Sequence, residues 1–158
     1  MSEENAIQPS LSVRRIFLKD ASLEMPSGAK IFNEDWNPSV NMDVAVNNEA
    51  LDETHYEVTL TLTVKVETAG KTAFLIEVHN AGIVALEGMN EEQRSHVLGA
   101  VCPNILFPYA RESVDNLATK ASFPPLMLAP INFDALYEQS KQSDNVPTLT
   151  VPAEAMTH

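Results

Sequence analysis

Strict alternation of apolar and polar residues over 56–67 is the feature that most constrains the fold of this chain. The apolar members are Tyr56, Val58, Leu60, Leu62, Val64 and Val66. Polar residues separate them, so one face of an extended strand is dry and the other is wet. This pattern is typical of an antiparallel sheet that other elements cover on one side only.

Three further segments predict strands of the same sheet. Residues 11–25 alternate imperfectly and end at a Pro-Ser-Gly turn. Residues 40–46 alternate cleanly, and 68–71 supply a hairpin turn. The strand after that turn buries Phe74, Ile76 and Val78. We therefore expect a sheet of four antiparallel strands.

The second half of the chain predicts helices. Asn90 with Gln93 fits a capping box, so a helix begins there and is expected to stop before Pro103. Pro108 suits the first position of a second helix, and Asp134 suits the cap of a third. The expected fold class is α+β, with a four-stranded antiparallel sheet and helices packed on one face.

Length and charge set limits on organisation and partners. A chain of 158 residues is one domain by length. We expect a flexible N-terminal arm at 1–10, the folded domain at 11–140 and a flexible tail at 141–158. The net charge of -12 disfavours nucleic acid and anionic membrane surfaces, and it favours basic partners.

Cysteine usage and the N-terminal sequence point to a cytoplasmic protein. The single cysteine, Cys102, rules out an internal disulfide and suits a reducing compartment. The acidic start M-S-E-E-N lacks the positive region of a secretory signal. No apolar run reaches the roughly 20 residues of a membrane span.

A proline-rich apolar segment at 121–133 is the strongest pointer to a binding surface. Its sequence A-S-F-P-P-L-M-L-A-P-I-N-F has no charge and three prolines, which forbid a helix or a central strand. Such a segment runs as a surface loop, and exposed apolar surface marks a binding place. Alternatively, the loop folds flat over its own core, and the two readings are compatible for different parts of it.

Catalytic patterns are weak. The four histidines show no metal-ligand spacing, and Cys102 has no second cysteine with which to hold zinc. Cys102 with His96 could form a nucleophile and base, but a small buried hydrophobe is the usual role of a cysteine in an apolar stretch. The five glycines form no phosphate-binding fingerprint. We expect no catalytic residue, no metal and no cofactor.

Two sets of residues suggest a second surface on the wet side of the sheet. Leu75 shares that side with Glu77, which is mildly suggestive of a docking surface, although a lone exposed leucine is ordinary. Asp20 and Glu24, evenly spaced on the first strand, are either a solvated edge or acidic contacts for a basic partner.

Two long motifs carry a resemblance to a known family. They are C-P-N-I-L-F-P-Y-A-R-E at 102–112 and F-P-x-L-x-L-A-P-I-N-F-D-A-L at 123–136. Shorter matches are R-I-F-L-K-D ending at Asp20, D-W-N-P at Asp35 and T-A-F-L-I-E-V at 72–78. Across roughly 10–138 the chain resembles the SecB protein-export chaperones.

The resemblance implies a cytoplasmic holdase that assembles as a homotetramer, a dimer of dimers. Such a protein binds unfolded preproteins, keeps them competent for translocation and delivers them to the SecA ATPase. By position, the client peptide groove would include Trp36, Val40, Met42, Val44, Phe123, Leu126, Leu128 and Phe133. The SecA-binding set would be Asp20, Glu24, Leu75 and Glu77, and the assembly set Ile76, Val78 and Asn80.

The chain departs from the family pattern at two places. Ile76 stands where the family often has cysteine, which is a tolerable change of volume in a core. The tail sequence V-P-A-E-A-M-T-H matches the family poorly. Two other functions stay open: a SecB-like chaperone for one dedicated partner, such as a toxin–antitoxin system, and a small-molecule-binding protein with a pocket under the proline-rich loop.

Overall fold

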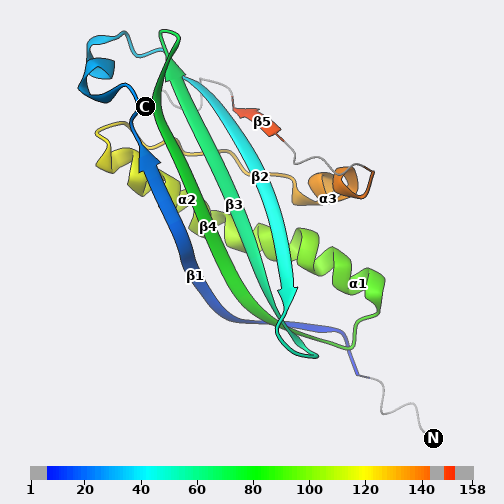
Figure 1. Ribbon diagram of the computed structural model, residues 1–158. Coiled ribbons are helices and arrows are strands. Elements are labelled where there is room, and N and C mark those ends of the chain that lie inside the picture. Colours follow the sequence, from blue (N-terminus) through cyan, green and yellow to red (C-terminus); the bar gives the residue numbers. More distant parts are fainter. Residues whose placement is uncertain (1–6, 143–147, 152–158) are drawn as a thin grey trace, which may run out of the picture.

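Four long antiparallel strands form the body of the sheet in the computed structural model, which describes residues 7–142 and 148–151 (Figure 1). They are β1 (Ser10–Glu24), β2 (Ser39–Ala50), β3 (His55–Thr68) and β4 (Lys71–Glu87). A short fifth strand, β5 (Thr148–Val151), adds to β2, and the strand order is β1-β4-β3-β2-β5. The predicted α+β class and antiparallel sheet are confirmed, with one strand more than expected.

Tight turns set the register of the central strands. In the β3–β4 hairpin Thr68 lies opposite Lys71, as the sequence predicts. Ala69 and Gly70 between them have φ angles of 53° and 73°, the left-handed values that a two-residue hairpin turn requires. This register puts the even-numbered apolar residues of β3 on the face that the helices cover.

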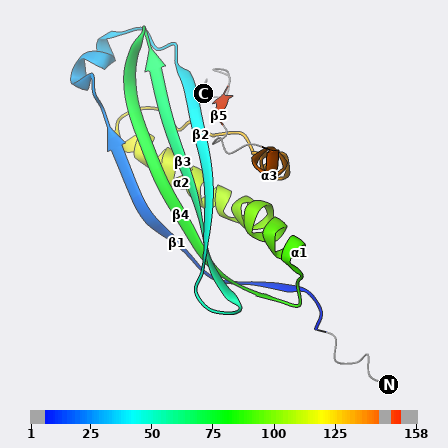
Figure 2. The same ribbon diagram turned by 45° about the vertical axis from the view of Figure 1, so that its right-hand side comes forward.

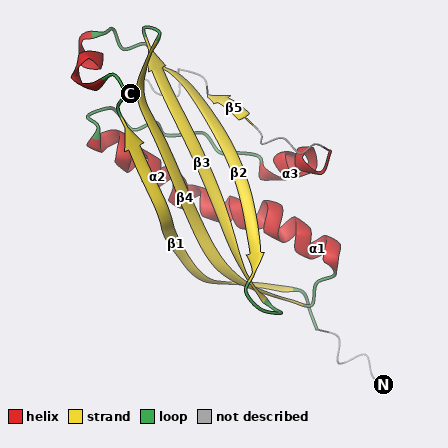
Figure 3. Ribbon diagram, viewed as in Figure 1, coloured by secondary structure: helices red, strands yellow, loops and turns green. Residues whose placement is uncertain are grey.

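The helices lie on one face of the sheet, and the other face is open (Figures 2 and 3). They are α1 (Glu91–His96), a π-helical turn (Val97–Val101), α2 (Cys102–Lys120) and α3 (Phe133–Gln142). A short 3-10 helix (Gly28–Asn33) follows β1. Ala110, Val114 and Ala118 are fully buried along the apolar stripe of α2, as its spacing predicts.

The predicted helix boundaries at the prolines are wrong. The capping box of Asn90 and Gln93 is present, but the helical run then continues through Pro103 and Pro108 to Lys120. Pro103 follows closely on the π turn, where the regular ladder of helical hydrogen bonds is already interrupted, and this irregular turn accommodates a residue without an N–H. The carbonyl that Pro108 leaves without its helical donor belongs to Asn104, an exposed residue that water can reach.

The third helix begins with a different cap from the predicted one. Asn132 Oδ1 accepts a hydrogen bond from the Ala135 N–H at 3.0 Å, so Asn132 rather than Asp134 satisfies the helix start. Asp134 instead lies 2.7 Å from His96 Nε2, at the junction of α1 and the π turn. Its carboxylate therefore ties α3 to the first helix.

The chain ends were expected to lack regular structure. Residues 1–6, 143–147 and 152–158 lie outside the described part, so the expectation of a flexible arm and tail stays a prediction there. Within the expected tail, Thr148–Val151 forms β5, which is a correction. Alternating Thr-Leu-Thr-Val suits a strand, and the open edge of β2 supplies its partner.

Candidate functional site

An aromatic cluster forms where the chain crosses from β1 to β2. We use this name for Phe32, Trp36, Phe74 and Phe123. The Phe123 ring stacks on Phe32 at a centroid distance of 5.2 Å and on Trp36 at 5.0 Å. It also contacts Phe74 at 4.8 Å. Phe32 is 51% exposed and Trp36 38% exposed, so the cluster presents aromatic surface to solvent on a buried base.

A buried threonine fixes the loop that carries Trp36. Thr68 Oγ1 donates to the Asp35 carbonyl at 2.7 Å and accepts from the Asn37 N–H at 2.9 Å. The hydroxyl thus holds the backbone on both sides of Trp36. Lys71 Nζ pairs with Glu34 Oε1 at 2.6 Å nearby. The Trp36 side chain is therefore presented by a loop that β3 and β4 hold in place.

One carboxylate of α2 holds the middle of the proline-rich loop. Asp115 Oδ1 accepts hydrogen bonds from the backbone N–H groups of Leu126, at 2.8 Å, and Met127, at 3.1 Å. Met127 has a φ of 51° and its side chain is 57% exposed. Leu126 and Leu128 on either side are fully buried. The loop therefore covers the core with alternate residues and shows the others to solvent.

Most of the predicted groove residues lie below the surface. The buried members are Val40, Met42, Val44, Phe123, Leu126, Leu128 and Phe133. They share one apolar core, so the structure brings them together, but only Trp36 of the predicted set is substantially exposed. Sequence reasoning missed Phe32. Its signal was an aromatic residue four positions before Trp36, in the short 3-10 helix that precedes the loop of Trp36.

The predicted SecA-binding residues lie together on the open face of the sheet. The β1–β4 register places Glu24 opposite Leu75 and Ser22 opposite Glu77. Directly opposed residues of an antiparallel pair share a face, so Asp20, two residues before Ser22, points the same way. No helix of the described residues covers this side (Figure 2).

Glu77 is the centre of a polar network on this face. His79 Nε2 lies 3.0 Å from Glu77 Oε2, and Thr63 Oγ1 donates to Oε1 at 3.2 Å. These hydrogen bonds, that of His79 first, hold the pKa of Glu77 below its ordinary value against the opposing effect of desolvation. The carboxylate is therefore ionised and held in position.

The three predicted assembly residues lie inside the protein. Ile76 and Val78 are buried under α2, and Asn80 is 3% exposed. The Asn80 Oδ1 atom has no hydrogen-bond partner among the described residues. These side chains cannot touch a second copy directly, so any effect on assembly passes through the packing of the sheet.

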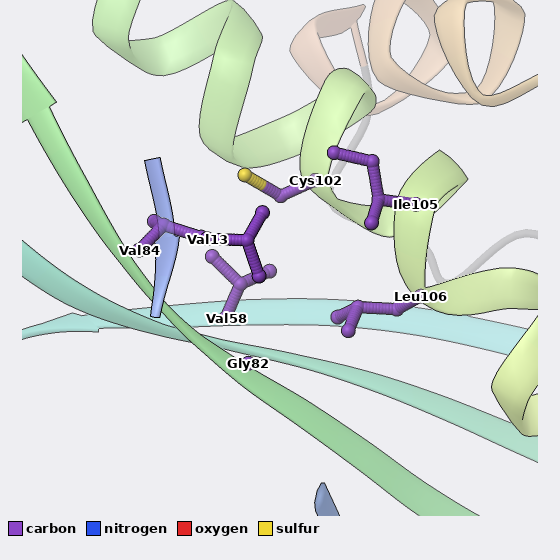
Figure 4. Close-up of a pocket in the computed structure, with 7 residues that line it drawn as sticks. All are labelled: Val13, Val58, Gly82, Val84, Cys102, Ile105 and Leu106. Carbon is purple, nitrogen blue, oxygen red and sulfur yellow. The ribbon is translucent and has the colours of Figure 1, made fainter. Parts of the chain in front are cut away.

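A small apolar recess surrounds Cys102 between the sheet and the start of α2 (Figure 4). Its volume is about 10 Å³, and valine side chains of three strands line it with Ile105 and Leu106. Burial raises the pKa of the Cys102 thiol to about 11, which disfavours the reactive thiolate. His96 Nε2 bonds to Asp134 Oδ1, and among the described residues no hydrogen bond joins His96 to the buried Cys102 thiol, so the structure does not pair the two as nucleophile and base.

The described residues were also compared with what a metal site, a ligand cleft and a membrane-spanning helix require. In the part of the chain that the structure describes, no group of three or more His, Cys, Asp or Glu side chains could hold a metal ion. An open cleft of about 210 Å³ lies between the π turn and the start of α3, but its His96 and Asp134 already bond to each other. Over the same described residues, no helix is long and apolar enough to cross a membrane.

The fold and these surfaces define a class of protein: an antiparallel sheet backed by helices on one face, with a half-exposed aromatic cluster and a separate open face that carries acidic residues. Comparison with known proteins narrows the class. The family model described as "Preprotein translocase subunit SecB" matches residues 4–144. The chain belongs to the SecB family.

Known SecB proteins are similar in sequence to this chain over almost its whole length. A "Protein-export protein SecB" of Psychrobacter arcticus is 50% identical over 142 residues, which cover 90% of this chain and 95% of that protein. One of Hahella chejuensis is 46% identical over 151 residues, 96% of this chain and 94% of that protein. A solved SecB-like chaperone of Mycobacterium tuberculosis, in complex with a ChAD peptide from an antitoxin, has a TM-score of 0.61 at 16% identity. That match covers 77% of this chain and 90% of the other.

Proposed function

We propose that this chain is a cytoplasmic export chaperone that binds unfolded preproteins, keeps them competent for translocation and delivers them to the SecA ATPase. The observation that carries the proposal is the half-exposed aromatic cluster on a fixed, buried base. Relatives that are about half identical over most of their length bear the name of protein-export proteins. The protein acts by binding, and release comes from transfer to a partner.

The client surface is centred on the exposed rings of Phe32 and Trp36. Met127 adds a flexible thioether that adapts to varied shapes. Apolar contact is non-directional, so the surface accepts many sequences. The buried residues of the predicted groove, Leu126 and Leu128 among them, support this surface from below.

Individual contacts of this kind are weak. Burial of apolar area contributes about 25 cal/mol per Å², but the ordering of a disordered client offsets much of it. Several such surfaces on one oligomer raise the overall affinity because the second contact forms at high effective concentration. A holdase therefore gains from being a homotetramer.

The free edge of the sheet supports assembly as a dimer of dimers. Within the described residues β1 pairs with β4 alone, so fifteen residues of its outer edge are open. Val13 and Leu18 on this strand are 41% and 51% exposed. A long open edge with apolar side chains is a template for pairing with a second copy. Ile76, Val78 and Asn80 would influence this contact through the core.

The acidic open face is the proposed docking surface for SecA. It contains Asp20, Glu24, Leu75 and Glu77, which come together from two neighbouring strands. Leu75 beside carboxylates, of which Glu77 is held by hydrogen bonds, offers a basic partner both burial and charge complementarity. The surface lies on the opposite side of the sheet from the helices, so it is separate from the covered core.

The dedicated-partner alternative has one observation behind it, the similarity in fold to the mycobacterial chaperone that binds an antitoxin peptide. At 16% identity that similarity concerns the fold, whereas the export proteins are about 50% identical. General export is therefore the better supported function.

The proposal is tested by the refolding of a preprotein diluted from denaturant. We expect a molar excess of the chain to slow refolding of the preprotein, and SecA with ATP to relieve the arrest. Refolding at the unassisted rate would contradict the proposal. Arrest of a single antitoxin, with none of several preproteins, would favour the dedicated-partner alternative.

A further inference from the structure

The chain covers part of the edge of β2 with its own C-terminal strand. Strand β5 pairs antiparallel with β2, and the register runs from Val40 opposite Val151 to Asp43 opposite Thr148. Both views place β5 beside β2, on the edge away from β1 (Figures 1 and 2). Residues 44–50 of β2 have no partner at this edge among the described residues.

The sequence limits how firmly β5 is held. It reads T-L-T-V, uncharged and alternating, with Pro147 directly before it and Pro152 directly after it. Proline has no N–H to donate to a neighbouring strand, so the two flanking prolines disfavour extension of the β2–β5 pairing beyond these four residues. Each fixed residue costs about 1–2 kcal/mol of backbone entropy, whereas each hydrogen bond returns only about 0.5–1.5 kcal/mol. A four-residue pairing is therefore displaceable.

The covered edge continues directly from the proposed client surface. Val40 lies four positions after Trp36, a chain distance of at most about 14 Å. An extended segment that contacts the aromatic cluster can therefore reach the edge of β2 without crossing the sheet. Strand addition gives affinity through the main chain and so tolerates many sequences.

We propose that the β2 edge at Val40–Asp43 is a strand-addition site for an extended, uncharged and apolar-alternating segment of an unfolded client, and that β5 occupies this site until the client displaces it. The tail then acts as an internal competitor whose sequence imitates the client. This inference rests on the proposed function, because it assumes that unfolded chains bind this protein.

The test uses full-length protein in which both central residues of β5 are replaced, Leu149→Pro with Thr150→Pro. One of two consecutive N–H groups in a strand faces its neighbour, so the pair of prolines removes a ladder donor whichever it is. The matched control is Ala153→Pro with Ala155→Pro, which adds two prolines to the tail outside β5. The probe is a permanently unfolded, reduced and carboxymethylated protein.

We expect the β5 variant to bind the unfolded probe about five- to tenfold more tightly than wild type, and the control to bind as wild type does. A synthetic peptide of residues 146–158 added to the β5 variant should restore the weaker affinity. Hydrogen exchange within Val40–Asp43, at the N–H groups that face β5, should quicken in the β5 variant and slow again when the probe binds.

Equal affinity of wild type and the β5 variant for the probe would overturn the inference while leaving the proposed function standing. Unchanged exchange at all four residues Val40–Asp43 in the β5 variant would overturn it as well, because β5 would then not protect the edge. Failure of every form to bind the probe would overturn both the inference and the proposed function.

Discussion

Asp115 on helix α2 holds the backbone of Leu126 in place through a hydrogen bond of 2.8 Å to its N–H. The same oxygen also accepts from Met127, so one carboxylate satisfies two consecutive donors of a loop that has no regular partner. The loop is thereby fixed with its leucines inward and Met127 outward.

Replacement of Asp115 by alanine should loosen this loop. Two N–H groups, one of them on a buried residue, would lose their acceptor, and we expect a loss of about 1–3 kcal/mol in the free energy of unfolding. Urea denaturation measures this change. Asp115→Asn keeps an acceptor oxygen and should lose less, and Glu112→Ala on the exposed side of α2 is the control. Equal effects of Asp115→Ala and Glu112→Ala would refute the anchoring role.

Gly99 in the π turn makes room for Tyr137 of α3. A Cβ atom at Gly99 would lie 2.6 Å and 2.8 Å from two atoms of the tyrosine ring. Gly99→Ala should therefore displace α3 from its packing against the π turn and lower the free energy of unfolding by about 1–3 kcal/mol. Tyr137→Ala removes the clash, so the two substitutions should be strongly non-additive in a double-mutant cycle. Simple additivity of their unfolding free energies would contradict this packing.

Reversal of the charge at Glu77 should affect binding to SecA and leave binding to the client unchanged. Glu77→Lys places a positive charge in the acidic face beside His79, so we expect at least a tenfold loss of affinity for SecA with client affinity unchanged. Calorimetric titration with each partner measures both. Glu138→Lys on α3 has the same change in net charge and should spare both affinities. A parallel fall in both, or no change in either, is incompatible with two separate surfaces.

The β2–β3 turn contains a carboxylate, Asp52, whose contribution to stability should be lost at low pH. Asp52 Oδ1 accepts from the backbone N–H groups of Thr54 and His55 and lies 2.9 Å from His55 Nδ1. Together these bonds, that of the Thr54 N–H first, lower the pKa of Asp52 from 3.8 to about 2. A lowered pKa means that this carboxylate's contribution to stability is complete above pH 3.8 and is lost as the pH falls through about 2.

Carboxyl chemical shifts followed by NMR during an acid titration measure this pKa. The Asp52 resonance should titrate with a midpoint near 2, and Asp52→Asn should abolish the transition. A midpoint at or above the ordinary value would show that the turn bonds do not form in solution.

The strands were predictable because local chemistry decides them. The alternation at 56–67 fixes which face of β3 is buried, and the turn residues Ala69 and Gly70 fix the register of its hairpin. The shared face of Asp20, Glu24, Leu75 and Glu77, the set proposed to bind SecA, follows from the same arithmetic, since evenly spaced residues of neighbouring strands share a face. The capping box of the first helix was equally local.

The helix boundaries, the loop at 121–133 and the aromatic cluster depend on tertiary contacts, which short sequence patterns do not reveal. Pro103 was expected to end one helix and Pro108 to begin the next. In the structure a π turn accommodates the first and an exposed carbonyl the second, within one helical run. The composition of the loop at 121–133 left open whether its leucines are exposed or cover the core, and in the structure the loop bonded to Asp115 has Leu126 and Leu128 turned inward. The stacking of Phe123 between Phe32 and Trp36 joins residues about ninety positions apart, so the exposed part of the cluster could not be foreseen.

The affinity of an unfolded preprotein for a Phe32→Ser variant, measured by calorimetry beside wild type, tests the central claim most directly. Leu51→Ser is a matched control, because Phe32 and Leu51 are both 51% exposed and Leu51 lies in the distant β2–β3 turn. Truncation of an exposed anchor leaves the core intact, so the oligomer should be unchanged in both variants. We predict at least a fivefold loss of affinity for Phe32→Ser and none for Leu51→Ser. Wild-type affinity in the Phe32→Ser variant would contradict the assignment of the aromatic cluster as the client surface.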